Sequence, residues 1–136
     1  MADFHFELVS PEKLLFSGDV QQVDVPGIEG DFGVLADHAP MVATLRPGIL
    51  TVHASGGAQK IVVLGGFAEV SKEGLTVLAD NADAVEDIDH GMIAAHIDDL
   101  QSRIAKTEPG SGLDKLITQL DHFKDVHRHL TGTAMH

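Results

Sequence analysis

The chain has 136 residues, the length of one ordinary domain or of a domain with a small appendage, and 43% of them are hydrophobic. Its 21 acidic residues outnumber its 9 basic ones and leave a net charge of −12, which argues against binding to nucleic acid or to an anionic lipid surface. The absence of cysteine excludes disulfides, thiol nucleophiles and Cys-based metal sites. No apolar run is long enough to span a bilayer, and residues 1–5 do not resemble a signal peptide, so we expect a cytoplasmic chain that does not insert into a membrane.

Residues 1–87 have the pattern of short β-strands broken by turns. Their 14 acids and 4 bases leave a net charge of −10, and most of the glycines and valines lie here. Ser55-Gly56-Gly57, between two β-branched runs, is typical of a hairpin turn because glycine adopts positive φ at no steric cost. Short strands with such turns predict an antiparallel sandwich or barrel. The expected strands include 4–9, 23–25, 32–35, 41–45, 49–53, 59–64, 67–70 and 75–79.

Residues 88–136 change to the period of a helix. Isoleucine and leucine recur at i, i+4, i+7 and i+11 from Ile93, and residues 107–110 then break the pattern. Ser111 is expected to cap a second helix with a heptad-like seam, so that two helices and a short loop form an antiparallel hairpin. We therefore expect two domains, 1–87 and 88–136. The seam contains Leu113, Leu116, Leu120, Phe123, His127 and Leu130.

Each candidate for chemistry in this sequence has a simpler structural explanation. The glycine-rich segment 27–33 has no following helix, and its acids would repel phosphate, so it predicts a turn. The histidines lack metal-binding spacing, and Asp37-His38 has no nucleophile beside it and predicts a turn. The acidic run from Asp80 to Asp89 lacks the spacing of a calcium-binding EF-hand and is typical of a linker and a helix N-cap. We expect no catalytic residue, no metal and no cofactor, and hence an interaction or regulatory protein.

A series of motifs then follows in a fixed order along residues 4–87. They are Phe6–Glu12 with Leu15–Gly18, Val25–Leu35, His38–Pro40, Arg46–Gly48, Leu64–Val70 and Val77–Asp80. This series resembles the epsilon subunit of bacterial F-type ATP synthase, whose mitochondrial counterpart is the delta subunit. The resemblance implies a β-sandwich of about ten short antiparallel strands followed by a C-terminal antiparallel α-helical hairpin.

The same resemblance implies a non-catalytic subunit of the central stalk, or rotor, which couples proton flow through the c-ring to rotation and ATP synthesis. It implies binding to the gamma subunit and the c-ring, conditional contact with the alpha and beta subunits of the catalytic head, and a peripheral position at the cytoplasmic face of the bacterial inner membrane. In many bacteria the hairpin restrains ATP hydrolysis. The implied residues are Glu29, Gly30, Asp31, Asp37, His38, Ala39 and Pro40 toward the c-ring, Gly65, Gly66 and Phe67 toward gamma, and Lys115, Lys124 and Arg128 on the regulatory helix.

One segment departs from the family pattern. Some members bind ATP through Ile/Leu-Asp-x-x-Arg-Ala at the start of the first helix, where this sequence has Ile88, Asp89, Met92 and Ile93 at the four specified positions. With no guanidinium to hold a phosphate, we expect no nucleotide site here. The alternative from another class is a free-standing β-sandwich, either a ligand-binding module or a metal-dependent enzyme. That alternative would need a pocket lined by converging histidines and carboxylates.

Overall fold

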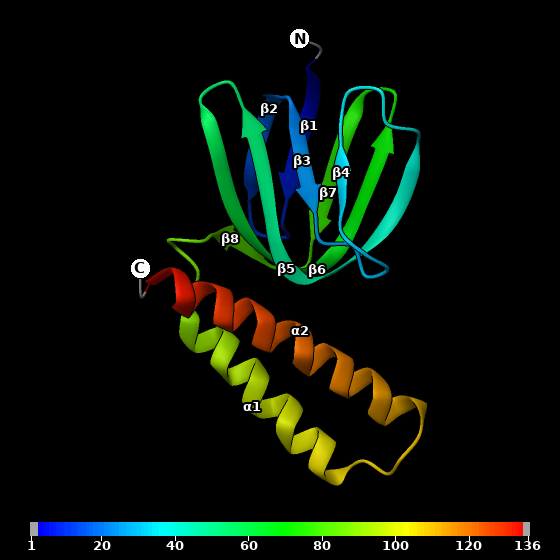
Figure 1. Ribbon diagram of the computed structural model, residues 1–136, viewed down its shortest axis with the longest axis vertical. Helices are drawn as coiled ribbons and strands as arrows, with labels where there is room; N and C mark the ends of the chain where they lie inside the picture. The colour runs from blue at the N-terminus through cyan, green and yellow to red at the C-terminus, as the bar shows by residue number, and fades with distance from the viewer. Residues whose placement is uncertain (1–2, 135–136) are drawn as a thin grey trace. The chain divides into compact units, whose positions relative to one another are not determined.

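The computed structural model describes residues 3–134, with side chains through Thr131. It divides into a β-rich unit that ends at Ile88 and a helical unit that begins at Asp89 (Figure 1). The boundary predicted after residue 87 lies one residue before this division. The strands are β1 (Phe4–Val9), β2 (Leu14–Val20), β3 (Gln22–Val25), β4 (Phe32–Val34), β5 (Met41–Ala54), β6 (Gly57–Ser71), β7 (Gly74–Ala79) and β8 (Ala82–Ala84).

The strands form two layers because β5 and β6 are long and pass from one layer into the other. The strand order is β2-β1-β7-β6-β5-β3-β4, with β8 paired to β6. One layer contains β2, β1, β7, the second half of β6 and the first half of β5. The other layer contains β4, β3, the second half of β5, the first half of β6 and β8. Each layer thus has five strand segments, which makes ten in the unit.

The crossing between layers occurs where the β5–β6 ladder skips one residue on each strand. Leu45 pairs with Gly66 and Pro47 pairs with Leu64, so Arg46 and Gly65 have no partner in this ladder. Their backbone groups bond elsewhere: Arg46 N donates to Pro26 O at 3.0 Å, and Gly65 O accepts from Asp80 N at 3.1 Å. An interrupted ladder lets a strand bend without losing hydrogen bonds.

The core lies between the two layers and is almost entirely aliphatic. Phe6 and Leu8 of β1 point inward while their neighbours point outward, as the period of two requires. The same alternation places residues from both layers in one cluster, which burial of apolar area stabilises. Its fully buried members include Phe6, Leu8, Val23, Leu50, Val52, Val63, Leu75 and Val77.

The predicted β-sandwich followed by a helical hairpin is confirmed, with two differences in detail. The runs predicted at 41–45 and 49–53 belong to the single strand β5, and those at 59–64 and 67–70 belong to β6. In addition, one strand pair is parallel: β1 runs alongside β7, with Phe6 opposite Leu75. Periodicity shows which face of a strand is buried, but it does not show the direction of the neighbouring strand.

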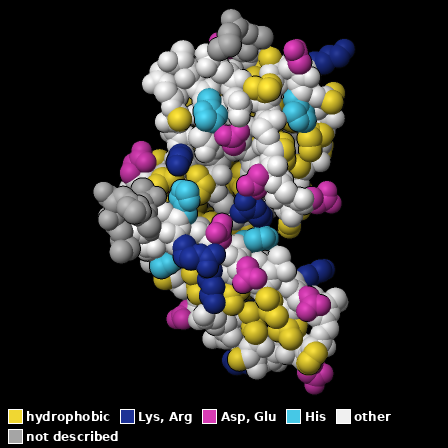
Figure 2. All heavy atoms as spheres, viewed as in Figure 1, with side chains coloured by type: hydrophobic (Ala, Val, Ile, Leu, Met, Phe, Trp, Pro, Cys, Tyr) yellow, Lys and Arg dark blue, Asp and Glu magenta, His cyan; other side chains and the backbone are white. Residues whose placement is uncertain are grey.

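The helical unit consists of α1 (His90–Lys106) and α2 (Ser111–Ala134). The ring of His96 on α1 stacks on that of Phe123 on α2, with centroids 4.9 Å apart and planes 13° apart. Ser111 is the first residue of α2 rather than its predicted cap, since Asp114 N donates to Gly110 O at 3.0 Å. Hydrophobic side chains also reach the surface of this unit (Figure 2). The buried residues of the two helices are Ile93, Leu100, Leu120, Phe123, Val126 and Leu130.

Among residues 3–134, no helix has the combination of length and apolar composition that crossing a membrane requires.

Candidate functional site

The β3–β4 loop is fastened to the edge of β5 by its backbone. Gly27 forms an isolated antiparallel bridge with Leu45, and Ile28 N donates to Thr44 O at 2.9 Å. The loop then reverses at Gly30, whose φ of 140° is open to glycine but strained for other residues. The turn predicted for this segment is confirmed, and its position on β5 is fixed by hydrogen bonds.

The two acids of this loop have different surroundings. Asp31 Oδ1 accepts from Arg46 Nη2 at 2.6 Å, and the Arg46 side chain is only 20% exposed. Glu29 is exposed and has no hydrogen bond or ion pair with any residue that the structure describes. Asp31 is therefore neutralised within the chain, whereas Glu29 carries a carboxylate that is available to a partner.

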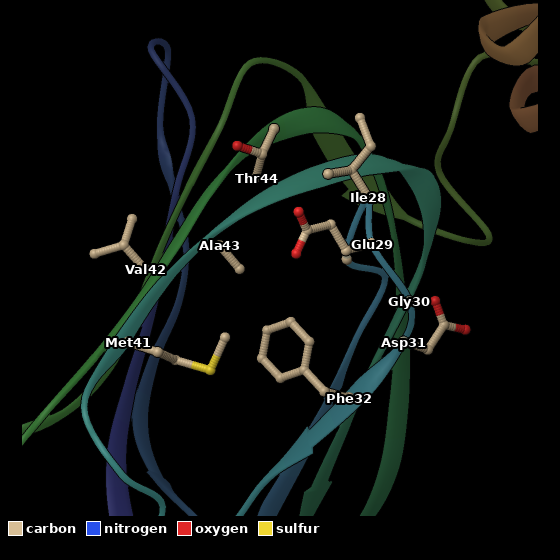
Figure 3. Close-up of a pocket in the computed structure, with 10 residues that line it drawn as sticks. Ile28, Glu29, Gly30, Asp31, Phe32, Met41, Val42, Ala43 and Thr44 are labelled. Carbon is tan, nitrogen blue, oxygen red and sulfur yellow. The ribbon is translucent and has the colours of Figure 1, made fainter.

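A hollow of about 410 Å³ lies between this loop and the start of β5. The ring of Phe32, the thioether of Met41 and the carboxylate of Glu29 converge on it, while Asp31 points away (Figure 3). The hollow thus combines an apolar floor with one unpaired negative charge. Its lining residues are Gly27, Ile28, Glu29, Gly30, Asp31, Phe32, Met41, Val42, Ala43 and Thr44.

The second segment expected at the c-ring, Asp37-His38-Ala39-Pro40, forms a turn just before β5. His38 N donates to Leu35 O at 3.0 Å, and His38 Nδ1 lies 2.8 Å from Ala39 O. The ring of His38 approaches that of Phe32, with centroids 6.2 Å apart. The two predicted segments thus adjoin opposite ends of β4: the β3–β4 loop lies beside the bend of β5 and β6, and the turn lies where β5 begins (Figure 1).

A stripe of exposed hydrophobic side chains crosses the outer face of the layer that contains β1. Residues directly opposite each other in neighbouring strands form it: Leu14 faces Val9, Val9 faces Leu78, and Leu78 faces Phe67. Phe67 is 54% exposed and Leu78 is 55% exposed. Phe67 in turn faces Thr44 on β5, beyond which Ile28 of the β3–β4 loop follows, and Val42 lies diagonally beside Phe67. We call the hydrophobic members of this set, all exposed except the half-buried Val9, the apolar stripe: Leu14, Val9, Leu78, Phe67, Val42 and Ile28.

Of the three residues expected at gamma, only Phe67 presents a side chain to the surface. Gly65 and Gly66 lie at the bend of β6, where both have positive φ. A Cβ on Gly66 would collide with the backbone oxygen of Leu78. These glycines therefore shape the strand that places Phe67 in the apolar stripe.

A polar cluster lies on the outer side of the other layer, where β3 pairs with β5. Asp24 Oδ2 lies 2.8 Å from His53 Nε2, and Asp24 Oδ1 accepts from Gln22 Nε2 at 2.7 Å. Burial raises the pKa of Asp24, but the hydrogen bonds from His53 and Gln22 and the charge of His53 outweigh it, so the net pKa lies below its ordinary value. Among the residues that the structure describes, no group of three or more acids and histidines could hold a metal ion.

The predicted regulatory residues Lys115, Lys124 and Arg128 are all exposed on α2. Arg128 Nη2 lies 3.4 Å from Asp125 Oδ1, so its charge is partly satisfied within the helix.

The residues at the degenerate nucleotide motif have structural roles. Asp89 caps α1, because its Oδ1 accepts from Gly91 N at 2.8 Å and from Met92 N at 3.3 Å. Ile88 and Ile93 are buried. This use of Asp89 confirms the predicted helix N-cap within the acidic run.

Apart from Phe67, the residues of the apolar stripe were not predicted from the sequence, and neither was the Asp31–Arg46 pair. The stripe does have a sequence signal, because Val9, Phe67 and Leu78 stand at positions where the alternation of their strands predicts a polar residue. The ion pair joins residues fifteen positions apart and has no periodic signal.

Comparisons with known proteins agree with this architecture. The family described as "ATP synthase, Delta/Epsilon chain, beta-sandwich domain" matches residues 3–85. Curated ATP synthase epsilon chains from Afipia carboxidovorans and Rhodopseudomonas palustris (strain BisA53) are 60% and 63% identical to this chain over 136 residues, which is the full length of each.

Solved structures include a similar chain in the mitochondrial ATP synthase of Euglena gracilis, with a TM-score of 0.67 and a sequence identity of 25%. The match covers all of the chain described here and 83% of the Euglena chain. A chain of the Tetrahymena thermophila enzyme, with a TM-score of 0.54 and 13% identity over 62% of this chain and 68% of that one, shows the fold alone. The chain described here therefore belongs to the delta/epsilon family of ATP synthase subunits and, within it, to the epsilon chains.

Proposed function

We propose that this chain is a non-catalytic rotor subunit in the central stalk of a proton-translocating F-type ATP synthase, where it couples proton flow through the c-ring to rotation and ATP synthesis. The apolar stripe is the observation that carries this proposal. A row of hydrophobic side chains on one sheet face, with Leu14, Val9, Leu78 and Phe67 directly opposite one another, is costly in water and is typical of a protein-binding site. The similar chain in the Euglena assembly of OSCP, F1 and the c-ring supports the same assignment.

The gamma subunit is the proposed partner of the apolar stripe. Phe67 lies near the centre of the stripe and has a large side chain with few rotamers, which suits it to anchor an interface. Gly65 and Gly66 support the contact by fixing the bend of β6 beneath Phe67. The acids Glu7 and Glu69 lie on strands of the same face and favour a partner with basic residues at the rim of its own patch.

A pair of matched substitutions tests this contact. Leu78 and Leu35 are both 55% exposed, but only Leu78 belongs to the apolar stripe. Leu78→Ser should weaken binding to purified gamma at least about tenfold, whereas Leu35→Ser should leave the affinity within about twofold. Biolayer interferometry with the two folded variants gives the comparison. Equal affinities for Leu78→Ser and the unchanged chain would contradict the proposal.

The c-ring is the proposed partner of the β3–β4 loop and of the turn between β4 and β5. Both segments are largely exposed and carry acids, and they would meet basic loops at a membrane surface by charge complementarity. The chain would thereby sit peripherally at the cytoplasmic face of the bacterial inner membrane without inserting into it. The residues proposed for this contact are Glu29, Gly30, Asp31, Asp37, His38, Ala39 and Pro40.

The helical hairpin is the proposed regulatory part. Lys115, Lys124 and Arg128 project from α2 into solvent and could meet acidic loops of the alpha and beta subunits if the helix extended toward the catalytic head. Such contacts would restrain ATP hydrolysis.

A further inference from the structure

We propose that the hollow between the β3–β4 loop and β5 is a receptor for one arginine side chain of a partner's loop, with Glu29 as its counter-ion. This inference rests on the proposed c-ring contact and specifies its chemistry. It arises from the combination of an apolar concavity and one unpaired carboxylate, rather than from acidity alone.

The floor of the hollow is suited to the aliphatic part of a long basic side chain. Phe32, Met41 and Ala43 form it, and Met41 and Phe32 also pack against the sandwich core from the other side. The methyl of Ala43 and the ends of the two larger side chains face into the hollow (Figure 3). Long cationic side chains bury their methylene groups on such surfaces while keeping the charged head near water.

The charge of the hollow is negative and uncompensated. Among the described residues that line it there is no lysine, arginine or histidine. Asp31 is already paired with Arg46 at 2.6 Å and turns away, so Glu29 alone directs its carboxylate inward. A cation entering the hollow would pair with Glu29 without displacing an internal ion pair.

Arginine fits this arrangement better than lysine. Its planar guanidinium stacks on an aromatic ring and binds a carboxylate with two parallel hydrogen bonds, and it sheds water more easily than an ammonium group. Phe32 supplies the ring and Glu29 the carboxylate within one hollow. Lysine could use only the charge.

The loop is already shaped for this contact before a partner binds. Gly30 N donates to Gly27 O at 3.2 Å, and Ile28 N is held by Thr44 O. A side chain at Gly27 would collide with Gly30 O and with the ring of Phe32, so glycine permits the close turn that places Glu29 over the hollow. A preformed receptor loses little conformational entropy when it binds.

Nuclear magnetic resonance of the full-length chain, labelled at the methionine methyl groups, tests the inference without any other subunit. The probe is the blocked peptide acetyl-Gly-Arg-Gly-amide, and its isosteric neutral control contains citrulline in place of arginine. We expect the arginine peptide to shift the Met41 methyl signal in a saturable way at tens of millimolar, roughly the affinity of a single side-chain contact. The Met92 methyl, on α1, should not move.

Two variants complete the test. Glu29→Gln should weaken the response of Met41 to the arginine peptide by about tenfold, whereas Glu12→Gln, which removes an exposed acid from another turn, should leave it unchanged. An equal response to citrulline, an unaltered response in Glu29→Gln, or no saturable shift by about 200 mM peptide would overturn the inference. These experiments contain no other subunit, so their failure would overturn the arginine receptor without bearing on the proposed place in the stalk. The stalk proposal would fail in a different experiment, if the unchanged chain did not bind gamma.

Discussion

Arg46 Nη2 lies 2.6 Å from Asp31 Oδ1 and joins the beginning of the bend in β5 to the far end of the β3–β4 loop. This pair assigns different roles to two acids that look equivalent in the sequence. Asp31 stabilises the loop from within, and Glu29 is left to interact with a partner. Charge reversal at both positions together would therefore mix an effect on folding with an effect on docking.

Separate substitutions should resolve the two roles. Asp31→Asn should lower the free energy of unfolding by about 1 kcal/mol, because it leaves the largely buried Arg46 without its carboxylate. Glu29→Gln should change it by less than about 0.3 kcal/mol, since Glu29 has no partner among the described residues. Urea denaturation followed by circular dichroism measures both. Equal losses in the two variants would show that the ion pair does not hold the loop.

Local sequence features accounted for most of the sandwich. The runs predicted at 4–9 and 75–79 correspond to β1 and β7, and Ser55-Gly56-Gly57 marked the β5–β6 hairpin, where Ala54 pairs with Gly57. Pro47-Gly48 and Gly65-Gly66 were expected to separate strands. They are bends within continuous strands, because neighbouring segments take up the backbone groups that the ladder releases there.

Relationships between distant residues could not be predicted in this way. The parallel pairing of β1 with β7 joins segments about seventy residues apart, and no periodicity encodes it. On α2, the heptad-like seam assigned His127 to the apolar side, whereas Val126 is the buried residue and His127 is only half-buried. A helix period of 3.6 drifts from a repeat of seven, so a seam extended over several turns loses its phase.

Gly66 gives a second prediction, on the stability of the bend in β6. Gly66→Ala should lower the free energy of unfolding by roughly 2–4 kcal/mol or prevent folding, because φ is 126° and the added Cβ would meet the backbone oxygen of Leu78. Gly56→Ala is the matched control, since no atom lies within 4 Å of the Cβ it would add. Thermal melts of both variants measure the difference in stability. If Gly66→Ala were as stable as the unchanged chain, the strand could bend there without glycine.

Asp24 gives a prediction of pH dependence. Its folded-state pKa lies below the ordinary value of 3.8, so the stability it contributes is present above that value and is lost as pH falls through the depressed pKa. Asp24 is about half exposed, so solvent screens the effect to roughly a few tenths of a kcal/mol. Asp24→Asn should therefore be slightly less stable than the unchanged chain at about pH 6 and equal to it near pH 2. A difference that persists or grows in acid would reverse the assigned sign.

The segment at the start of α1 predicts that the chain does not bind ATP. Asp89 already accepts two backbone N–H groups as the cap of α1, and the positions of the family's Arg and Ala are taken by Met92 and the fully buried Ile93. No guanidinium is available there to hold a phosphate. Isothermal titration with about 1 mM Mg-ATP should give only the heat of dilution. A saturable isotherm in that range would contradict this prediction.

The charges of α2 set the expected strength of any regulation. Its three basic residues, Lys115, Lys124 and Arg128, are matched by Asp114, Asp121 and Asp125, so with neutral histidines the helix carries no net charge. Attraction to an acidic surface of the catalytic head should then be weak at neutral pH.

The last prediction follows from this balance. ATP hydrolysis by the reassembled catalytic head at neutral pH should be restrained only slightly, by less than about twofold, by the full-length chain. A chain that ends at Ile88, the last residue of the β-rich unit, should not restrain it at all. That shortened chain must first give a cooperative melt, which its self-contained core predicts. Identical hydrolysis with the full and shortened chains would leave the hairpin a structural brace, since a regulator must change activity when it is removed.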